Sequence, residues 1–289
     1  MENPPITSLN ELDVTKTDVT IKVRILKLWK LLSFKVKNAI HAVELILMDE
    51  EGTKIQASVG GNYLVKYGRL LLEKSCVMVT KFDVGDNVSP YRPTNHKHKL
   101  FFNFSTDIRN IDEFGGSIHG FSFTSFDVLR NRAILQDSPV DIIGYVDGWF
   151  PMVDHTSSNG RLNKKMSLQL RDLEFLNIYL TLWGDYAVQM SKFLERKPSD
   201  VFVILQFGRY SFHEGKAYVS SSFQNSNLYL NESIDELTDF QKRLLESRPN
   251  VGSSSRPFGS SQAGKTVRDD FLVGTEFKSI DEVNKIGRQ

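Results

Sequence analysis

The sequence of 289 residues contains a single cysteine, Cys76, and no long apolar segment. One cysteine excludes an intramolecular disulfide and any cysteine-rich zinc site. No apolar run approaches the roughly 20 residues of a membrane span, and the N-terminus lacks the charged-then-apolar pattern of a signal peptide. These absences predict a soluble intracellular protein that makes no contact with a membrane.

A strong net charge is also missing, because 36 Lys and Arg residues nearly balance 35 Asp and Glu residues. The balance changes along the chain. Residues 14–110 contain 16 basic and 9 acidic side chains, whereas residues 111–250 contain 14 basic and 18 acidic ones. The first half therefore offers the better electrostatic match to a polyanion, although the charge is not that of a histone-like binder.

No arrangement of residues indicates catalysis. The six histidines are scattered, and no Ser/His/Asp set, paired carboxylate or reactive thiol can be located. Residues 259–266 match the phosphate-loop pattern of nucleotide hydrolases, but that chemistry needs a strand before the loop and a helix after it. A Ser- and Pro-rich linker precedes this segment instead. We therefore expect no enzyme, no cofactor and no metal site.

Alternating apolar and polar residues predict strands in two sets. The first strand, 19–29, alternates apolar and basic residues, so its outward side is expected to carry Lys22 and Arg24. The first set comprises strands 19–29, 41–48, 54–59, 75–84 and 99–106, with helical spacing over 62–72. The second comprises strands 140–149, 166–171, 176–183, 201–210 and 216–222, with a helix over 185–194.

Three strands, a helix and two more strands form the layout of an OB-fold barrel. The pairs Trp29/Trp149 and Asp49/Asp172 recur at an offset of about 120 residues, which indicates a duplicated domain. We predict an all-β dominated protein of two tandem five-stranded OB-fold barrels with short helices. The expected units are a lead-in (1–13), a first OB fold (14–112), a connection (113–138), a second OB fold with a closing helix (139–247), and a flexible linker and tail (248–289).

The segment that ends in Trp183 is the main candidate for a binding site. Ile178, Leu180 and Leu182 alternate with Tyr179, Thr181 and Trp183, which places Trp183 on the side of the strand away from the core. A flat aromatic ring at the end of a sheet face suits the stacking of a nucleobase. The alternative is that Trp183 closes one end of the core.

Several ordered segments carry a resemblance to a known family. In the second domain they are 140–146, 168–172, 182–187 and 219–222, and in the first domain 44–49 and 52–57. In this order and spacing they resemble the large subunit of replication protein A, the eukaryotic single-strand DNA-binding protein, and in detail its divergent plant copies. The resemblance implies single-stranded DNA binding in the nucleus, in replication, repair or recombination. It also implies other replication protein A subunits or DNA-repair proteins as partners.

The family stacks bases on two aromatic residues in each domain. The resemblance places Trp183 on the main stacking position of the second domain, and leaves open whether Phe212 or His213 is its companion. In the first domain Tyr91 matches one aromatic position, but Gly60 occupies the other. Basic side chains expected to follow a phosphate backbone are Lys22, Arg24, Lys35, Lys37, Arg92, Lys97, Lys99, Arg161, Lys164 and Lys165.

The last part of the chain departs from the family. Residues 276–283 resemble the lead-in to a third, zinc-bearing domain, and one cysteine cannot build that zinc site. We therefore also keep the expectation of a degenerate tandem OB module that binds a protein and has weak or lost strand binding.

Overall fold

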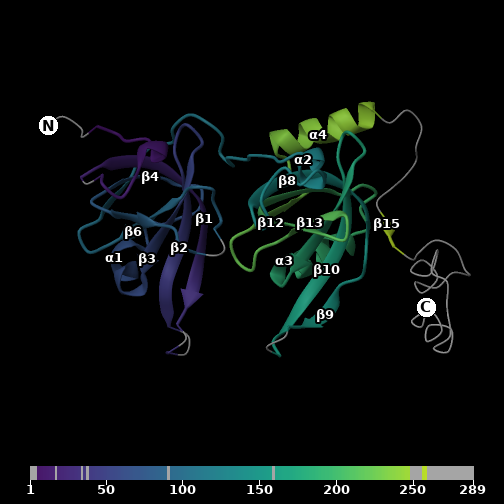
Figure 1. The fold of residues 1–289 in the computed structure, drawn as a ribbon, viewed down its shortest axis with the longest axis horizontal. Helices are drawn as coiled ribbons and strands as arrows, with labels where there is room; N and C mark the ends of the chain where they lie inside the picture. The colour runs from purple at the N-terminus through teal and green to yellow at the C-terminus, as the bar shows by residue number, and fades with distance from the viewer. Residues whose placement is uncertain are drawn as a thin grey trace, which may run out of the picture.

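The computed structural model describes residues 5–16, 18–33, 35–36, 39–89, 92–157, 160–247 and 256–258. Its strands form two curled sheets, one in each half of the chain, joined by a connection that contains a short helix (Figure 1). This arrangement confirms the predicted tandem OB-fold architecture. No helix in the described ranges has both the length and the apolar character needed to span a membrane.

The first sheet follows the strand order β5-β6-β3-β2-β1-β4-β7. Strand β3 pairs in parallel with β6, and only two residues separate β4, next to one edge of the curled sheet, from β5 at the other edge. A short helical segment lies between β3 and β4, and Tyr67 of this segment is buried in the core of the barrel. The elements are β1 Thr20–Leu32, β2 Ile40–Met48, β3 Lys54–Gly60, η2 Gly61–Tyr63, α1 Leu64–Tyr67, β4 Cys76–Thr80, β5 Asp83–Asp86, β6 His98–Phe102 and β7 Asp107–Asn110, preceded by η1 Leu9–Glu11.

The second sheet closes into a ring, because β12 pairs with both β8 and β13, and β13 pairs in parallel with β11. Helix α3 follows β11 directly, at the place where the first barrel has α1. The elements are α2 Phe126–Arg130, β8 Pro139–Trp149, β9 Val153–Thr156, β10 Leu162–Arg171, β11 Asn177–Trp183, α3 Asp185–Leu194, β12 Phe202–His213, β13 Lys216–Ser220, β14 Asn227–Leu230, α4 Asp235–Glu246 and β15 Arg256–Pro257.

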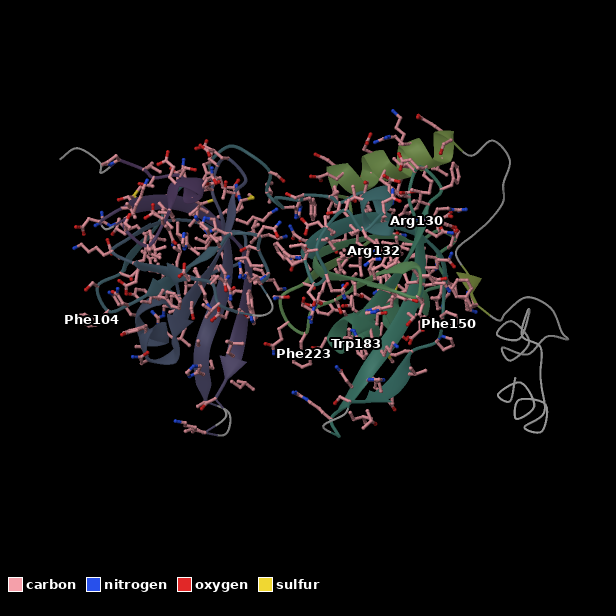
Figure 2. All side chains as sticks on the ribbon, viewed as in Figure 1. Phe104, Arg130, Arg132, Phe150, Trp183 and Phe223 are labelled. Atoms are coloured by element: carbon pink, nitrogen blue, oxygen red, sulfur yellow. The ribbon has the colours of Figure 1, made fainter. Side chains whose placement is uncertain are left out.

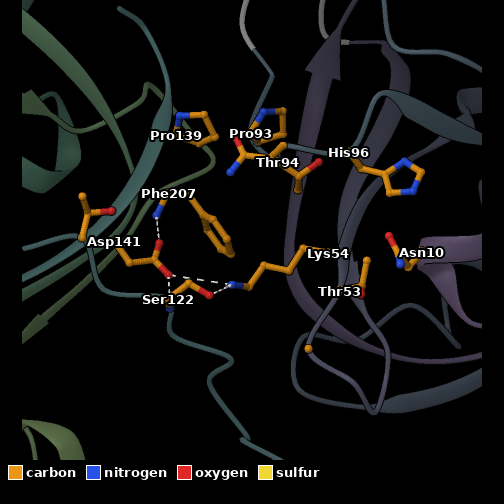
Figure 3. A pocket seen from close by; sticks show the side chains of 13 residues that line it. Asn10, Thr53, Lys54, Pro93, Thr94, His96, Ser122, Pro139, Asp141 and Phe207 are labelled. Atoms are coloured by element: carbon orange, nitrogen blue, oxygen red, sulfur yellow. Dashed lines mark hydrogen bonds and ion pairs between the residues drawn. The ribbon is translucent and has the colours of Figure 1, made fainter. Parts of the chain in front are cut away.

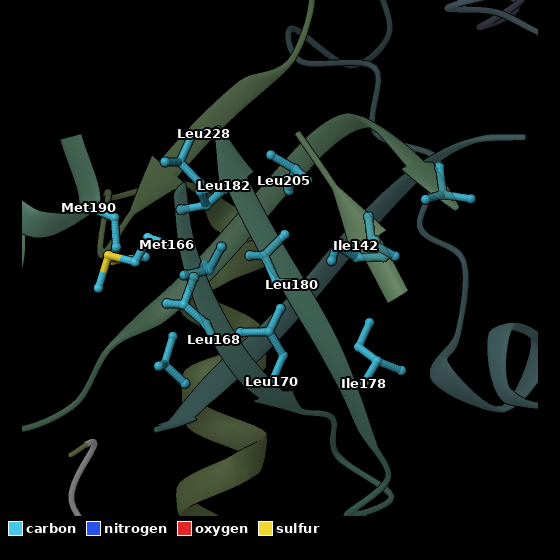
Figure 4. Close-up of a cluster of buried hydrophobic side chains, with 14 of the residues drawn as sticks. Ile142, Met166, Leu168, Leu170, Ile178, Leu180, Leu182, Met190, Leu205 and Leu228 are labelled. Atoms are coloured by element: carbon cyan, nitrogen blue, oxygen red, sulfur yellow. The ribbon is translucent and has the colours of Figure 1, made fainter. Parts of the chain in front are cut away.

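Strict alternation in β10 and β11 builds the core of the second barrel. Leu168 and Leu170 of β10 pair with Leu180 and Ile178 of β11, and all four side chains are at most 1% exposed (Figure 4). Burying one such side chain contributes about 1.5–3 kcal/mol. The same alternation leaves the odd-numbered residues of β11 on the outer face, where the binding site is expected.

The turns after β2 and β10 are built in the same way in the two barrels. In the first barrel Asp49 accepts a hydrogen bond from Thr53 N through Oδ1 at 2.8 Å. In the second barrel Asp172 accepts one from Leu176 N through Oδ1 at 2.7 Å. An aspartate that binds a backbone N–H group four residues later holds a tight turn, so both copies use the same device.

The remaining differences from the predicted elements are local. The helix expected over 62–72 is only η2 and α1, and the strand expected over 75–84 is divided into β4 and β5. The strand expected over 166–171 begins earlier, at Leu162, and forms a hairpin with β9, and the short strands β7, β9 and β14 were not predicted. These short strands have too few residues to establish a period, so alternation could not reveal them.

Candidate nucleic-acid interface

The outer face of β11 presents a row of partly exposed side chains. Tyr179, Thr181 and Trp183 alternate with Ile178, Leu180 and Leu182, whose exposed fraction is 0%. The prediction that Trp183 points away from the core is therefore confirmed, and the alternative that it closes the core is wrong. Trp183, labelled in Figure 2, is the last residue of β11 and pairs across the sheet with Lys165 of β10.

Trp183 has an aromatic and a cationic neighbour. The His155 ring of β9 lies edge-on at 5.1 Å between ring centroids, and the Lys165 Nζ atom lies 5.5 Å from the Trp183 ring centroid. The backbone is fixed by a hydrogen bond of 2.9 Å from Trp183 N to Ser221 Oγ. A ring held in one place beside an ammonium group can stack a base and attract its phosphate at the same time.

A second aromatic group on this face is formed by two tyrosines that alternation alone did not single out as binding residues. Tyr179 of β11 and Tyr218 of β13 stack with 5.2 Å between ring centroids and 25° between ring planes. Lys216 Nζ lies 5.3 Å from the Tyr179 ring centroid. The signal was present, because the alternation that placed Trp183 outward also placed Tyr179 outward.

The structure distinguishes the two neighbours Phe212 and His213. Phe212 packs against the core cluster and lies under the Arg132 guanidinium, 5.0 Å from its ring centroid. His213 is exposed, pairs with Lys216 across the β12–β13 turn, and lies 6.2 Å from the Tyr218 ring. His213 therefore belongs to the aromatic face, whereas Phe212 lies partly buried against the core cluster, and its stacking role stays a prediction.

The loop and hairpin beside Trp183 supply the predicted basic residues of the second barrel. Arg161 is exposed and its guanidinium lies 5.2 Å from the ring centroid of Phe223, which is 57% exposed. Lys164 forms an ion pair with Asp154 across the β9–β10 hairpin. Lys165 and Lys164 are sequence neighbours, yet only Lys165 lies against Trp183.

The equivalent face of the first barrel has different chemistry. The Glu44 carboxylate accepts hydrogen bonds from Gln56 Nε2 at 2.6 Å and Ser58 Oγ at 2.7 Å, and it pairs with Lys99 Nζ at 2.7 Å. The Glu44 side chain is 5% exposed. A buried carboxylate at the centre of this face compensates Lys99 and repels a phosphate chain, so the face is a poor match to DNA.

One aromatic side chain does lie at the edge of the first-barrel face. Phe101 of β6 is 40% exposed and pairs in register with Ser58 of β3. Its ring lies over Gly85, where a Cβ atom would come within 2.9 Å of it. Leu100 and Phe102 point into the core, so alternation could have identified Phe101 as outward-facing. Gly60 ends β3 as Trp183 ends β11, consistent with the expected loss of one stacking position.

Two predicted phosphate contacts lie elsewhere. Arg24 is 1% exposed, donates to Phe114 O and Lys74 O, and pairs with Glu113 at 3.6 Å. The prediction that it faces solvent is wrong, because the connection at 113–114 covers this side of β1. Lys22 lies 4.8 Å from the Phe114 ring centroid and 3.9 Å from Glu50, at the end of the barrel away from the β1–β2 loop.

Other predicted residues lie in loops. Lys35 and Lys97 are exposed, and Arg92 is exposed at a small cavity that Pro139 and Arg209 of the second barrel also line. Tyr91, Lys37 and the phosphate-loop match at 259–266 lie outside the described residues. Within the described ranges, no group of three His, Cys, Asp or Glu side chains could hold a metal ion.

A domain family described as "Domain of unknown function DUF223" matches residues 10–132. A 70 kDa DNA-binding subunit of replication protein A from Arabidopsis thaliana is 24% identical over 247 residues. The match covers 80% of this chain but 31% of the plant protein, so the chain spans about a third of that relative.

A solved structure supports the fold. The chain superimposes on a chain of a replication protein A heterotrimer bound to ssDNA with a TM-score of 0.59 and 18% identity, covering 86% of this chain and 57% of that one. The sequence match and the shared tandem OB architecture confirm the resemblance predicted from the sequence. In sequence and in fold, this chain is therefore similar to the large subunit of replication protein A.

Proposed function

We propose that this chain binds single-stranded DNA without catalysing a reaction, as a nuclear protein of DNA replication, repair or recombination. The observation that carries the proposal is the outer face of the second barrel, where Trp183 and the Tyr179–Tyr218 stack each lie beside a lysine. Base stacking on aromatic rings and phosphate attraction by lysines together bind single strands with little sequence preference. The plant relative named above is itself described as DNA-binding.

The proposal assigns different tasks to the two barrels. The second barrel stacks bases on Trp183, Tyr179 and Tyr218, with Lys165, Lys216 and Arg161 near the phosphates. The first barrel contributes Phe101 and loop cations such as Lys35 and Lys97, whereas Glu44 weakens the centre of its face. Other replication protein A subunits or DNA-repair proteins are the protein partners that fit this role.

The test is a titration of fluorescently labelled oligo-dT with the wild type and with Trp183→Ala, at about 50 and 200 mM salt. We expect wild-type affinity to fall steeply with salt, because each neutralised phosphate of a single strand contributes a slope of about −0.7 in log K against log salt. Trp183→Ala should weaken binding by about 5- to 150-fold, from the 1–3 kcal/mol of one stacked base. Duplex DNA of equal length should compete poorly.

Phe104→Ala is the matched control, because Phe104 is 78% exposed and lies on the far side of the first barrel (Figure 2). It should bind as the wild type does. Wild-type binding no tighter than that of a neutral control protein would reject the proposed function and leave the protein-binding module in its place. Unchanged binding by Trp183→Ala would reject the stacking role of that residue.

A further inference from the structure

One side chain of the second barrel is buried in the first. Phe207 of β12 is 4% exposed and forms a cluster with Leu26, Ile46 and Met48, all of the first barrel. Trp29 of β1 packs against the same cluster. The ring therefore fills an apolar site on the neighbouring domain instead of contributing to the core of its own barrel.

The backbone at Phe207 is in a conformation that a phenylalanine rarely adopts. Its φ angle is 56°, in the left-handed region, and the β12–β8 register shifts between Leu205 and Gly208. A bulge of this kind redirects a side chain out of the regular alternation of the strand. A bulky residue with positive φ costs of order 1–3 kcal/mol and persists only where surrounding contacts hold it.

Several hydrogen bonds hold this strained residue. Asp141 Oδ1 accepts from Phe207 N at 2.9 Å, and Phe207 O accepts from Ser226 Oγ at 3.0 Å and Ser222 Oγ at 3.3 Å. The preceding residue, Gln206, donates from Nε2 to His119 O of the connection at 2.8 Å. The second barrel and the connection thus fix the direction in which the ring points.

Polar contacts cross the same interface. Lys54 of β3 reaches from the first barrel to Ser122 Oγ at 3.0 Å and to the Asp141 carboxylate at 3.9 Å (Figure 3). Asp141 Oδ2 also accepts from Ser122 N at 2.9 Å. A cavity of about 480 Å³ lies beside these residues. The Asp141 carboxylate therefore contacts both Phe207 N and Lys54 of the first barrel. It links the polar contact between the barrels to the apolar contact made by the Phe207 ring.

We propose that Phe207 is a positioning residue for strand binding, a latch that holds the two OB barrels in one relative orientation. The long hairpins β1–β2 and β9–β10 extend in the same direction from the two barrels (Figure 1). A DNA strand that crosses the outer faces of both barrels then meets two faces that are already aligned. The barrels therefore lose little freedom of relative orientation when DNA binds. This inference rests on the proposed function for its DNA readout, while the latch itself can be measured without DNA.

Phe207→Gly is the informative variant, because glycine accepts the positive φ without strain and removes the ring. The second barrel should fold normally, and only the contact with the first barrel is lost. We expect Phe207→Gly to bind an oligo-dT of about 20 nucleotides, long enough for both barrels, about tenfold more weakly than the wild type. Binding of an oligo-dT of about 8 nucleotides, which fits one OB fold, should not change.

The orientation itself is measured by pulsed electron spin resonance between labels at Val65→Cys on α1 and Lys192→Cys on α3, two positions in different barrels. Cys76, which is 3% exposed, is replaced by serine so that only the two introduced cysteines carry labels. The distance distribution should be narrow in the otherwise wild-type chain and broad with Phe207→Gly. Phe104→Ala is the control and should keep the narrow distribution.

The possible outcomes separate the latch from the DNA function. An equally narrow distribution in Phe207→Gly would overturn the latch. A broad distribution with no selective loss of long-oligonucleotide binding would overturn the positioning role. A wild type that binds neither oligonucleotide would reject the proposed function and the positioning role with it, while the spin-label distances would still decide whether the latch exists.

Discussion

Tyr179 and Tyr218 stack ring on ring, 5.2 Å apart, on two strands that pair in parallel. Gln56 and Lys99 occupy the same paired position in the first barrel, on β3 and β6. There Gln56 and Lys99 both contact the Glu44 carboxylate. The duplicated barrels have therefore kept the register of their strands and changed the chemistry of the outer face, from an ion network in the first to aromatic rings in the second.

The tyrosine pair should contribute to DNA binding as a unit. Tyr179→Ala and Tyr218→Ala should each weaken binding of oligo-dT by about 5- to 150-fold, since one stacked base is worth about 1–3 kcal/mol. The double variant should lose less than the sum of the two free energies, because each ring holds the other in place. Fluorescence anisotropy titrations of the four proteins form the complete cycle.

Tyr218→Phe is the conservative control for this cycle. It keeps the ring and removes only the hydroxyl group, so binding within about twofold of the wild type is expected if stacking is the mechanism. A loss as large as that of Tyr218→Ala would assign the binding to the hydroxyl group. Additive effects of the two alanine substitutions would show that the rings act independently.

Lys164 and Lys165 should differ in their effect on salt dependence. Lys165 lies over Trp183, while Lys164 pairs with Asp154. Lys165→Ala should make the slope of log K against log salt less steep by about 0.7, the value for one phosphate contact of a single strand. Lys164→Ala should change the slope much less, because an aspartate already compensates its charge. Equal changes in slope for the two variants would show that DNA phosphates contact Lys164 as well as Lys165.

Removing the buried negative charge of the first barrel should strengthen DNA binding. Glu44→Gln frees Lys99 from its carboxylate partner, so the slope of log K against log salt should become steeper by about 0.7. Glu195→Gln makes the same charge change at the exposed residue after α3 and is the matched control. Equal gains from both variants would attribute the effect to net charge instead of to the first-barrel face.

Alternation in the sequence predicted the longer strands correctly. It gave the wrong exposure for side chains on the outer face of a strand that another segment of the chain covers. Alternation correctly placed Trp183 on the outer face, but it also placed Arg24 there. Arg24 is buried because residues 113–114 lie across β1, and no local pattern reveals such a long-range contact. The same limit applies to Glu44, whose three hydrogen-bonding partners come from other strands.

The choice between Phe212 and His213 depended on a bulge. Val203 and Leu205 of β12 point into the core, whereas after the bulge Tyr210 and Phe212 do. One extra residue exchanges the two faces of a strand. The four residues around the bulge, Leu-Gln-Phe-Gly, are all buried or small. They do not alternate between apolar and polar, so the sequence could not reveal the change of register.

Lys54 and Asp141 should stabilise the folded chain only as a pair. Burial raises the pKa of Asp141 and the Lys54 ammonium opposes that shift, while burial lowers the pKa of Lys54. Lys54→Met leaves a buried carboxylate without a counter-charge, so it should lower the free energy of unfolding at pH 7 by about 1–3 kcal/mol. Adding Asp141→Asn should recover most of this loss, as urea denaturation of both variants and the wild type will show.

The pH dependence of these variants follows from the raised pKa of Asp141. The folded state binds the Asp141 proton more tightly than the unfolded state does, so folding is favoured by protonation of this group. The ionised Asp141 carboxylate lowers the free energy of unfolding, and this loss is fully present above the pKa of Asp141 in the folded state. The loss is relieved as the pH falls through that pKa toward the unfolded value of 3.8. In Lys54→Met the folded pKa rises further, because the opposing ammonium is gone. The stability of Lys54→Met relative to the Lys54→Met/Asp141→Asn protein should therefore increase as the pH falls from 7, whereas a difference independent of pH would show that the lost stability comes from packing of the lysine chain instead of from charge.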